Sequence, residues 1–205
     1  MISFALWCDR HYETSTEKET KVSIITSVFK GDKYIKEFLK DITRQTVFDS
    51  CELILINPNS PGNEEPVIKQ YLKQYPNNIV YKKLDYDPGL YEVWNIGIKI
   101  ARGKYITNAN LDDRRAPEHI EKHLKVLEEN SNVDLACASL KVTRKENETW
   151  ENNTAHTTWF GPGFPEDIKT KHLFRKEKVN GVAASKIVSQ CIPHCMPIWR
   201  KSLHD

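Results

Sequence analysis

Residues 103–115 read Gly-Lys-Tyr-Ile-Thr-Asn-Ala-Asn-Leu-Asp-Asp-Arg-Arg and join a strand pattern to a cluster of polar side chains. The run 104–107 is rich in β-prone residues, and Pro117 favours the start of a helix soon afterwards. Two carboxylates, Asp112 and Asp113, therefore follow the carboxyl end of a predicted strand. In an open α/β sheet ligands bind at that edge, because the loops there border the crevice between diverging helices.

The polar cluster supplies only oxygen ligands. Asp112 and Asp113 are adjacent, and the Asn110 amide lies two residues before them. Such a set suits a hard divalent cation, Mg2+ or Mn2+, rather than zinc. The alternative is that the two carboxylates only lead into the following helix, where capping and the helix dipole favour acidic residues. This segment alone leaves both interpretations open.

Strand and helix patterns alternate around this stretch. Apolar, β-branched runs at 22–28, 52–56 and 79–81 predict buried strands, and an apolar run at 133–142 predicts a further one. Between these runs, apolar residues recur at the spacing of an amphipathic helix. The alternation predicts an α/β fold with a doubly wound, mainly parallel sheet and helices on both faces.

Two helical segments carry specific expectations. In the helix after the Asp-Pro-Gly turn at 87–89, Leu90 and Trp94 are expected on the inner side, and core packing is the favoured role of Trp94. In the helix after Pro117, His119 and His123 lie one turn apart among charged residues, which indicates an exposed face.

The chain divides into three parts by composition. Residues 1–21 form a polar lead-in, 22–143 the α/β core, and 144–205 an aromatic loop with a further segment of the same domain. The stretch 144–165 is irregular and rich in aromatic residues, which either fold over a ligand or plug the edge of the sheet.

Composition limits the classes of function. The 205 residues carry 30 basic and 28 acidic side chains and a formal net charge of +2, which argues against a dedicated nucleic-acid binder. Five cysteines form no even framework, so we expect a reducing, cytoplasmic environment. No apolar run approaches the roughly 20 residues that a transmembrane helix needs, so no transmembrane segment is expected.

Several segments together resemble the family-2 glycosyltransferases of the GT-A fold. The order and spacing of these segments carry the resemblance, since a short acidic motif alone is common. It spans 22–142, and Trp-Arg-Lys-Ser at 199–202 is similar to a segment further along such enzymes. The matching segments are the strand patterns at 22–28 and 52–56, Trp-Asn-Ile-Gly-Ile at 94–98, Ala-Arg-Gly-Lys-Tyr-Ile at 101–106 and Asn-Leu-Asp-Asp at 110–113.

The resemblance implies a binding site for a nucleoside-diphosphate sugar. In the family the turn after the first strand packs on the donor nucleotide, and an acidic residue after the second strand commonly binds the base. This chain has Asn57-Pro58-Asn59 there, so amides or main chain would read the base. The implied donor-binding residues are Thr26, Ser27, Phe29, Asn57, Asn59, Asn95 and Asn110.

The resemblance also implies a metal site and a reaction. The family motif is usually Asp-x-Asp; Asn110 replaces its first residue, Asp112 keeps the metal-facing position and Asp113 follows it. The implied reaction is metal-assisted, inverting transfer of the sugar to a hydroxyl of a glycan, protein or lipid-linked acceptor.

A carboxylate base must take the proton of that hydroxyl. By position Glu166 or Asp167 could serve, with a solvated helix start as the alternative. Family members generally supply the base beyond the Trp-Arg-Lys segment. We therefore expect either a chain truncated before the acceptor region or a natural donor-binding core.

Other functions compete with transfer. A non-catalytic sugar-nucleotide or glycan-binding domain would fit Asn110 and the missing base, whereas a nucleotidyltransferase would need a glycine-rich loop after the first strand. Arg114 and Arg115 could bind phosphate or lie on the surface. Cys191, His194 and Cys195 are a weak zinc set, because their spacing is cramped and a fourth ligand is missing.

Overall fold

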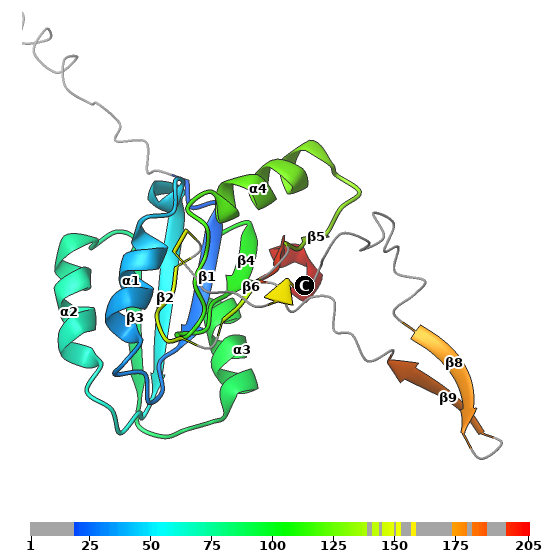
Figure 1. The fold of residues 1–205 in the computed structure, drawn as a ribbon, viewed down its shortest axis with the longest axis horizontal. Coiled ribbons are helices and arrows are strands. Elements are labelled where there is room, and N and C mark those ends of the chain that lie inside the picture. Colours follow the sequence, from blue (N-terminus) through cyan, green and yellow to red (C-terminus); the bar gives the residue numbers. More distant parts are fainter. Residues whose placement is uncertain are drawn as a thin grey trace, which may run out of the picture.

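A six-stranded sheet with the strand order β3-β2-β1-β4-β10-β5 forms the centre of the molecule (Figure 1). The computed structural model describes residues 19–138, 141–143, 145–149, 151–152, 157–158, 174–179, 182–187 and 196–205. Two small antiparallel pairs, β6 with β7 and β8 with β9, lie outside the main sheet.

The main sheet is mostly parallel. β1 (Val22–Ser27) pairs in parallel with β2 (Cys51–Pro58) and β4 (Tyr105–Asn108), and β2 pairs in parallel with β3 (Ile79–Leu84). β10 (Ile198–Arg200) runs antiparallel between β4 and β5 (Leu135–Ala136). The remaining strands are β6 (Lys141–Val142), β7 (Thr157–Thr158), β8 (Phe174–Val179) and β9 (Val182–Ile187).

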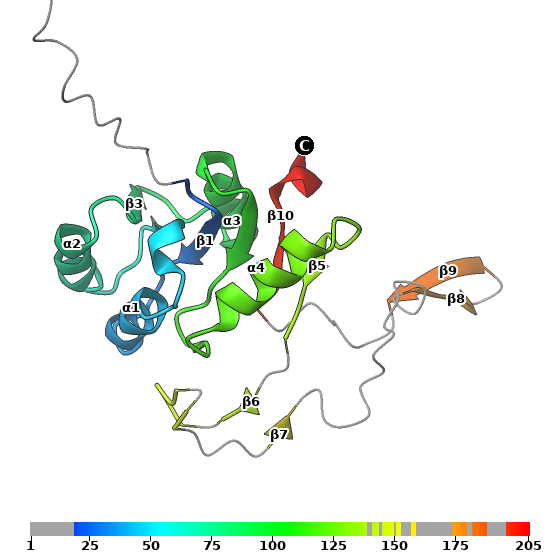
Figure 2. The same cartoon turned by 90° about the horizontal axis from the view of Figure 1, so that it is seen from above.

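Helices cover both faces of this sheet, as the sequence predicts. α1 (Ile35–Thr43), α2 (Glu65–Gln74) and α4 (His119–Glu129) lie on one face, and α3 (Leu90–Ile100) lies on the other (Figure 2). Short 3-10 helices, η1 (Phe48–Ser50) and η4 (Lys201–His204), precede β2 and follow β10.

The strand residues alternate between two apolar layers, because successive side chains of a strand point to opposite faces. Ile24 packs in the layer that holds α1, α2 and α4, whereas the next residue, Ile25, packs against α3. Gly97 brings α3 close to β1: a Cβ at this position would lie 2.3 Å from Ile25 Cγ2. Trp94 packs against the same layer, in agreement with its expected core role.

Two expectations about the elements are wrong. The strand predicted over 133–142 is represented in the main sheet by Leu135–Ala136 alone, while Lys141–Val142 pair with β7. Among the described residues, β5 pairs with the three-residue strand β10 at the edge of the main sheet. Leu90 is exposed rather than inward-facing, because it is the first residue of α3 and precedes the turn that packs on the sheet.

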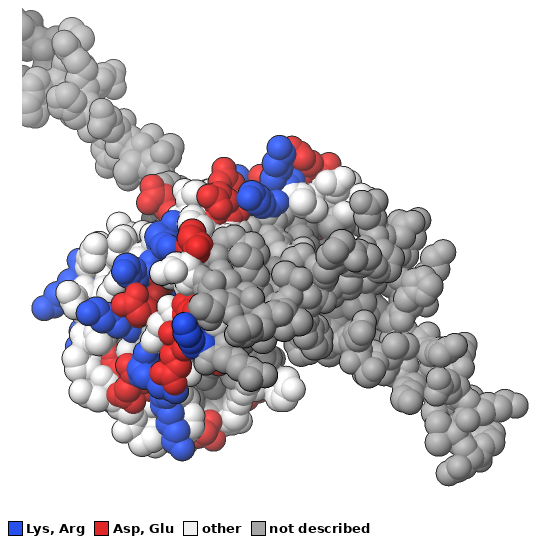
Figure 3. Space-filling view, viewed as in Figure 1, with Lys and Arg blue, Asp and Glu red and all other residues white. Residues whose placement is uncertain are grey.

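The surface of the described residues carries both signs of charge. In the face shown in Figure 3, Lys and Arg side chains alternate with Asp and Glu over the helices. Within the described part of the chain, no helix is both long and apolar enough to cross a membrane.

Candidate functional site

Three loops meet at the carboxyl edge of the parallel strands, following β1, β2 and β4. Main-chain hydrogen bonds to the strands hold the first residue after β1 and the first residue after β4: Val28 N donates to Ile56 O at 2.7 Å, and Ala109 N donates to Ile25 O at 2.8 Å. The acidic motif therefore begins at the edge where an α/β sheet binds its ligands.

A buried carboxylate joins the first two loops. Glu64 is fully buried; its Oε1 accepts hydrogen bonds from Gly31 N at 2.6 Å and from Ser60 Oγ at 2.9 Å. Ser60 Oγ also accepts from Lys30 N at 2.9 Å. The other carboxylate oxygen of Glu64, Oε2, is buried and has no hydrogen-bond partner among the described residues.

The third loop packs on the first through Gly31. A Cβ at Gly31 would lie 2.2 Å from Leu111 Cδ1, so the leucine side chain fills the space that this glycine leaves open. Leu111 stands inside the acidic motif, between Asn110 and Asp112. The loops after β1, β2 and β4 thus form one connected edge.

The two adjacent carboxylates have different surroundings. Asp113 is half-buried and accepts a hydrogen bond at Oδ2 from Asn110 Nδ2 at 2.9 Å. Burial raises the pKa of Asp113, and the bond from Asn110 opposes that rise. Asp112 is exposed, and within the described residues its carboxylate accepts no hydrogen bond. Asp112 is therefore the carboxylate of this pair that is open to a ligand.

The two arginines that follow the motif, Arg114 and Arg115, donate hydrogen bonds to main-chain carbonyls of the motif and of the end of β4. Arg114 Nη1 donates to the carbonyls of Leu111 at 2.8 Å and Asp113 at 2.7 Å. Arg115 is neither on the surface nor open to phosphate: it is fully buried, and Nη2 donates to Asn108 O at 2.7 Å. Its Nε and Nη1 have no partner among the described residues, and burial lowers its pKa.

The exposed position expected for His119 and His123 is wrong. Both are buried with ring centroids 4.2 Å apart, and His119 Nε2 lies 3.1 Å from Met196 O. Burial, with the nearby Arg115 charge, lowers the pKa of His119 to about 2. The segment at Met196 comes from the far end of the chain, so the local charge pattern of α4 could not indicate this cover.

The predicted donor-binding residues differ in their exposure to solvent. Thr26 and Asn57 are buried. The Asn57 amide is used internally, since Nδ2 donates to Tyr81 Oη at 3.1 Å and Oδ1 accepts from Ser60 N at 2.7 Å. Ser27 is half-buried, whereas Phe29, Asn59, Asn95 and Asn110 are exposed.

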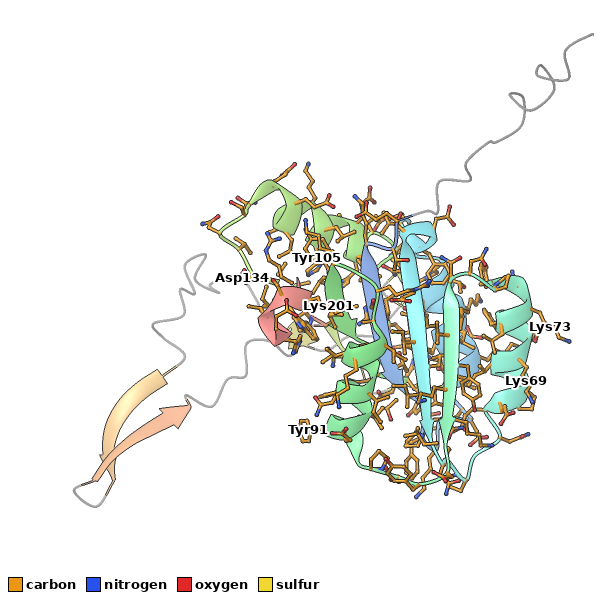
Figure 4. The ribbon with its side chains drawn as sticks, turned by 180° about the vertical axis from the view of Figure 1, so that it is seen from behind. Lys69, Lys73, Tyr91, Tyr105, Asp134 and Lys201 are labelled. Carbon is orange, nitrogen blue, oxygen red and sulfur yellow. The ribbon has the colours of Figure 1, made fainter. Side chains whose placement is uncertain are left out.

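The start of α3 borders the same edge. Asn95 Nδ2 donates to Glu92 Oε2 at 3.1 Å. Tyr91 is 79% exposed and points outward, with its ring edge-to-face against Trp94 at a centroid distance of 5.7 Å (Figure 4). Tyr91 adds an aromatic surface to this edge, which the polar motifs of the sequence do not indicate.

Several sequence-based candidates lie outside the described residues. These are the proposed bases Glu166 and Asp167 and the weak zinc set Cys191, His194 and Cys195. Among the residues that the structure does describe, no group of three or more His, Cys, Asp or Glu side chains is arranged to hold a metal ion. A cation at this edge would therefore need ligands from a bound substrate besides Asp112.

The family model for "Glycosyl transferase family 2" matches residues 23–205. The chain belongs to this family. Among its family-2 relatives, the minor teichoic acid biosynthesis protein GgaB of Bacillus subtilis is 33% identical over 132 residues, which are 64% of this chain and 14% of GgaB.

Solved structures show the same fold. S. aureus TarS 1-349 in complex with UDP-GlcNAc superimposes with a TM-score of 0.54 at 20% identity, covering 89% of this chain and 46% of that one. The mannosyltransferase PcManGT from Pyrobaculum calidifontis, in complex with GDP-Man and Mn2+, gives 0.54 at 18% identity, covering 62% and 36%. The chain thus spans less than half the length of each of these three proteins.

Proposed function

We propose that this chain binds a nucleoside-diphosphate sugar and a divalent cation at the carboxyl edge of β1, β2 and β4, and transfers the sugar to an acceptor hydroxyl with inversion. The observation that carries the proposal is the open Asp112 carboxylate, on a loop where Asn110 bonds Asp113 and Arg114 Nη1 bonds two main-chain carbonyls. Family membership and the donor complexes of TarS and PcManGT support this class of donor.

The residues present fit Mn2+ or Mg2+. Such a cation usually takes one or two protein carboxylates and completes its shell with waters and substrate phosphates. Asp112 is the primary ligand in this proposal, and Asp113 the second, because Asp113 already accepts a hydrogen bond from Asn110. When bound, the cation neutralises the charge that develops on the leaving nucleoside diphosphate.

The other residues bind and orient the donor. In this proposal Ser27, Phe29 and Asn59 line the nucleotide side of the edge. Asn95 contacts the donor from α3, while Asn110 serves through the orientation of Asp113. The buried Thr26 and Asn57 support the loops from beneath and do not touch the ligand themselves, because their side chains are enclosed.

The acceptor's proton requires a base. Glu166 or Asp167 would take it as the hydroxyl attacks the anomeric carbon. The acceptor is a hydroxyl of a glycan, a protein or a lipid-linked molecule, and the proposed place of action is the cytoplasm.

Calorimetric titration with UDP-, GDP- and dTDP-sugars, with and without Mn2+, tests the donor site. We expect one donor class to bind in a Mn2+-dependent way and Asp112→Asn to weaken it by about 10-fold or more, since even the loss of a residue that supports a metal ligand commonly costs about 10- to 100-fold. Asp134→Asn is the matched control, because this exposed carboxylate immediately precedes β5, away from the acidic motif, and forms an ion pair with Arg200 at 3.6 Å (Figure 4). Equal binding by wild type and Asp112→Asn would contradict the proposal.

A second function is favoured by the presence of Asn110 in place of a carboxylate. A non-catalytic sugar-nucleotide or glycan-binding domain would bind its ligand without releasing a nucleoside diphosphate. Measuring that release in the presence of Mn2+ and candidate acceptors separates the two functions, since a transferase releases the diphosphate and a binding domain does not.

A further inference from the structure

Residues at and just beyond the carboxyl-terminal end of α1 form hydrogen bonds with the main chain of residues 115–117, which follow the acidic motif. Asp41 is buried, and its Oδ2 accepts a hydrogen bond from Arg115 N at 2.8 Å. Its other oxygen, Oδ1, accepts from Arg44 Nη2 at 3.0 Å, and the same Nη2 lies 3.4 Å from Arg115 O. Asp41 in the last turn of α1 and Arg44 directly after the helix therefore hold both main-chain groups of Arg115, three residues after Asp112.

These contacts continue along the next residues. Gln45 Nε2 donates to Ala116 O at 3.0 Å, and Gln45 Oε1 accepts from Ile120 N at 3.3 Å. Thr46 N donates to Pro117 O at 3.0 Å. α4 has no side-chain cap of its own at its first turn, so Gln45 supplies an acceptor to one of the N–H groups that every helix start leaves unpaired.

We propose that Asp41, assisted by Gln45, is a positioning residue that fixes the Asp112 carboxylate for cation binding. The inference rests on the proposed function, because it concerns the same cation. Asp41 is well placed for this task, since α1 is anchored in the core by the fully buried Phe38, Leu39 and Ile42. The loop at 110–116 thereby takes its position from a rigid helix rather than from a regular ladder of its own.

The loop is held from two further directions. Arg115 Nη2 ties it to the end of β4 through Asn108 O, and Leu111 rests on Gly31. The contact of Asp41 with Arg115 N adds a fixed point on the carboxyl side of Asp112. Sites whose ligands are held by such supporting contacts lose affinity when a contact is removed, commonly by 10- to 100-fold for metals.

The test measures Mn2+ binding to the folded chain, with UDP or GDP present, by electron paramagnetic resonance. We expect Asp41→Asn to raise the Kd for Mn2+ by about 10-fold or more. We also expect faster hydrogen exchange at the amides of 112–116. Thr43→Val is the matched control on α1, because the Thr43 hydroxyl bonds Leu39 O at 2.9 Å within the helix and not the loop. The control is expected to leave both readouts unchanged.

The outcomes separate this inference from the proposed function. If wild type binds Mn2+ and folded Asp41→Asn binds it equally well with unchanged exchange, the positioning role is refuted. If wild type itself binds no Mn2+, the proposed function fails, and the inference fails with it. Should Asp41→Asn not fold, Gln45→Leu provides the same comparison, because it removes the contacts to Ala116 and Ile120 and leaves Asp41 in place.

Discussion

Replacing Glu64 by alanine removes the link between the loops after β1 and β2. Glu64 is fully buried, and its Oε1 accepts from the buried Gly31 N at 2.6 Å and from Ser60 Oγ at 2.9 Å. A buried donor left without an acceptor costs about 1–3 kcal/mol, and hydrogen bonds to charged groups contribute about 1.5–3 kcal/mol each. Removing Oε2, which is buried without a partner, offsets part of this loss. We therefore expect Glu64→Ala to lower the free energy of unfolding by about 2–4 kcal/mol.

Urea denaturation followed by circular dichroism measures this change. Glu65→Ala is the matched control: Glu65 is the next residue, and its half-buried carboxylate forms surface ion pairs with the exposed Lys69 at 2.7 Å and Lys83 at 3.0 Å. Exposed pairs contribute little, so the control is expected to unfold close to wild type. If Glu64→Ala stays within about 0.5 kcal/mol of wild type, the usual range of a neutral surface change, the buried link does not stabilise the loops.

The buried histidine pair makes stability depend on pH. Burial lowers the pKa of His119 to about 2 and also lowers that of His123, so the folded state stays neutral while the unfolded chain takes up protons below about pH 6.5. The contribution of the two neutral histidines to the free energy of unfolding is complete above that pH and falls by up to about 1.4 kcal/mol per pH unit and histidine below it. Urea titrations at about pH 7.5 and pH 5.5 should therefore show that the stability advantage of wild type over His119→Gln shrinks at the lower pH, and a constant difference would contradict this. A Cβ at Gly103 would lie 2.6 Å from Ser23 N, so Gly103→Ala should cost about 1–3 kcal/mol and lower the melting temperature by several degrees, whereas an unchanged melting temperature would mean that the contact relaxes freely. Arg115→Met should leave the free energy of unfolding within about 1 kcal/mol of wild type or raise it, because Nε and Nη1 of the buried guanidinium have no partner among the described residues and their desolvation offsets the bond from Nη2 to Asn108 O; a large loss in urea denaturation would show that this bond outweighs the desolvation cost.

The parallel part of the fold could be predicted from local patterns. The runs at 22–28 and 52–56 are strands because their apolar, β-branched residues are covered on both faces. β10 (Ile198–Arg200) could not be predicted in the sheet, since three residues carry no period and its partners are distant: Trp199 pairs with both Ile106 and Leu135.

The site could be predicted only where its chemistry is local. Asp112 follows a strand within one short motif, so the sequence alone indicates its position. Glu64 and Asp41 act on main-chain groups 33 and 74 residues away, and no sequence period connects them to Gly31 or Arg115. Such contacts depend on the packing of helices against the sheet, which the pattern of apolar residues does not specify at the level of single atoms.

Glu64 and Asp41 both supply acceptors to main-chain N–H groups of the irregular loops at this edge, on two sides of the acidic motif. An irregular loop has no ladder to pair its N–H groups, and each buried N–H without an acceptor is costly. Each of these buried carboxylates accepts a hydrogen bond from one such N–H group, Glu64 from Gly31 N and Asp41 from Arg115 N. Both carboxylates consequently lie below the surface. The exposed Asp112 stands on a loop that Asp41 holds directly and that packs, through Leu111, on the Gly31 held by Glu64. A cation at this edge would therefore meet a held carboxylate rather than a diffuse acidic patch, and substrate phosphates would have to complete its shell, which makes binding of cation and donor mutually dependent.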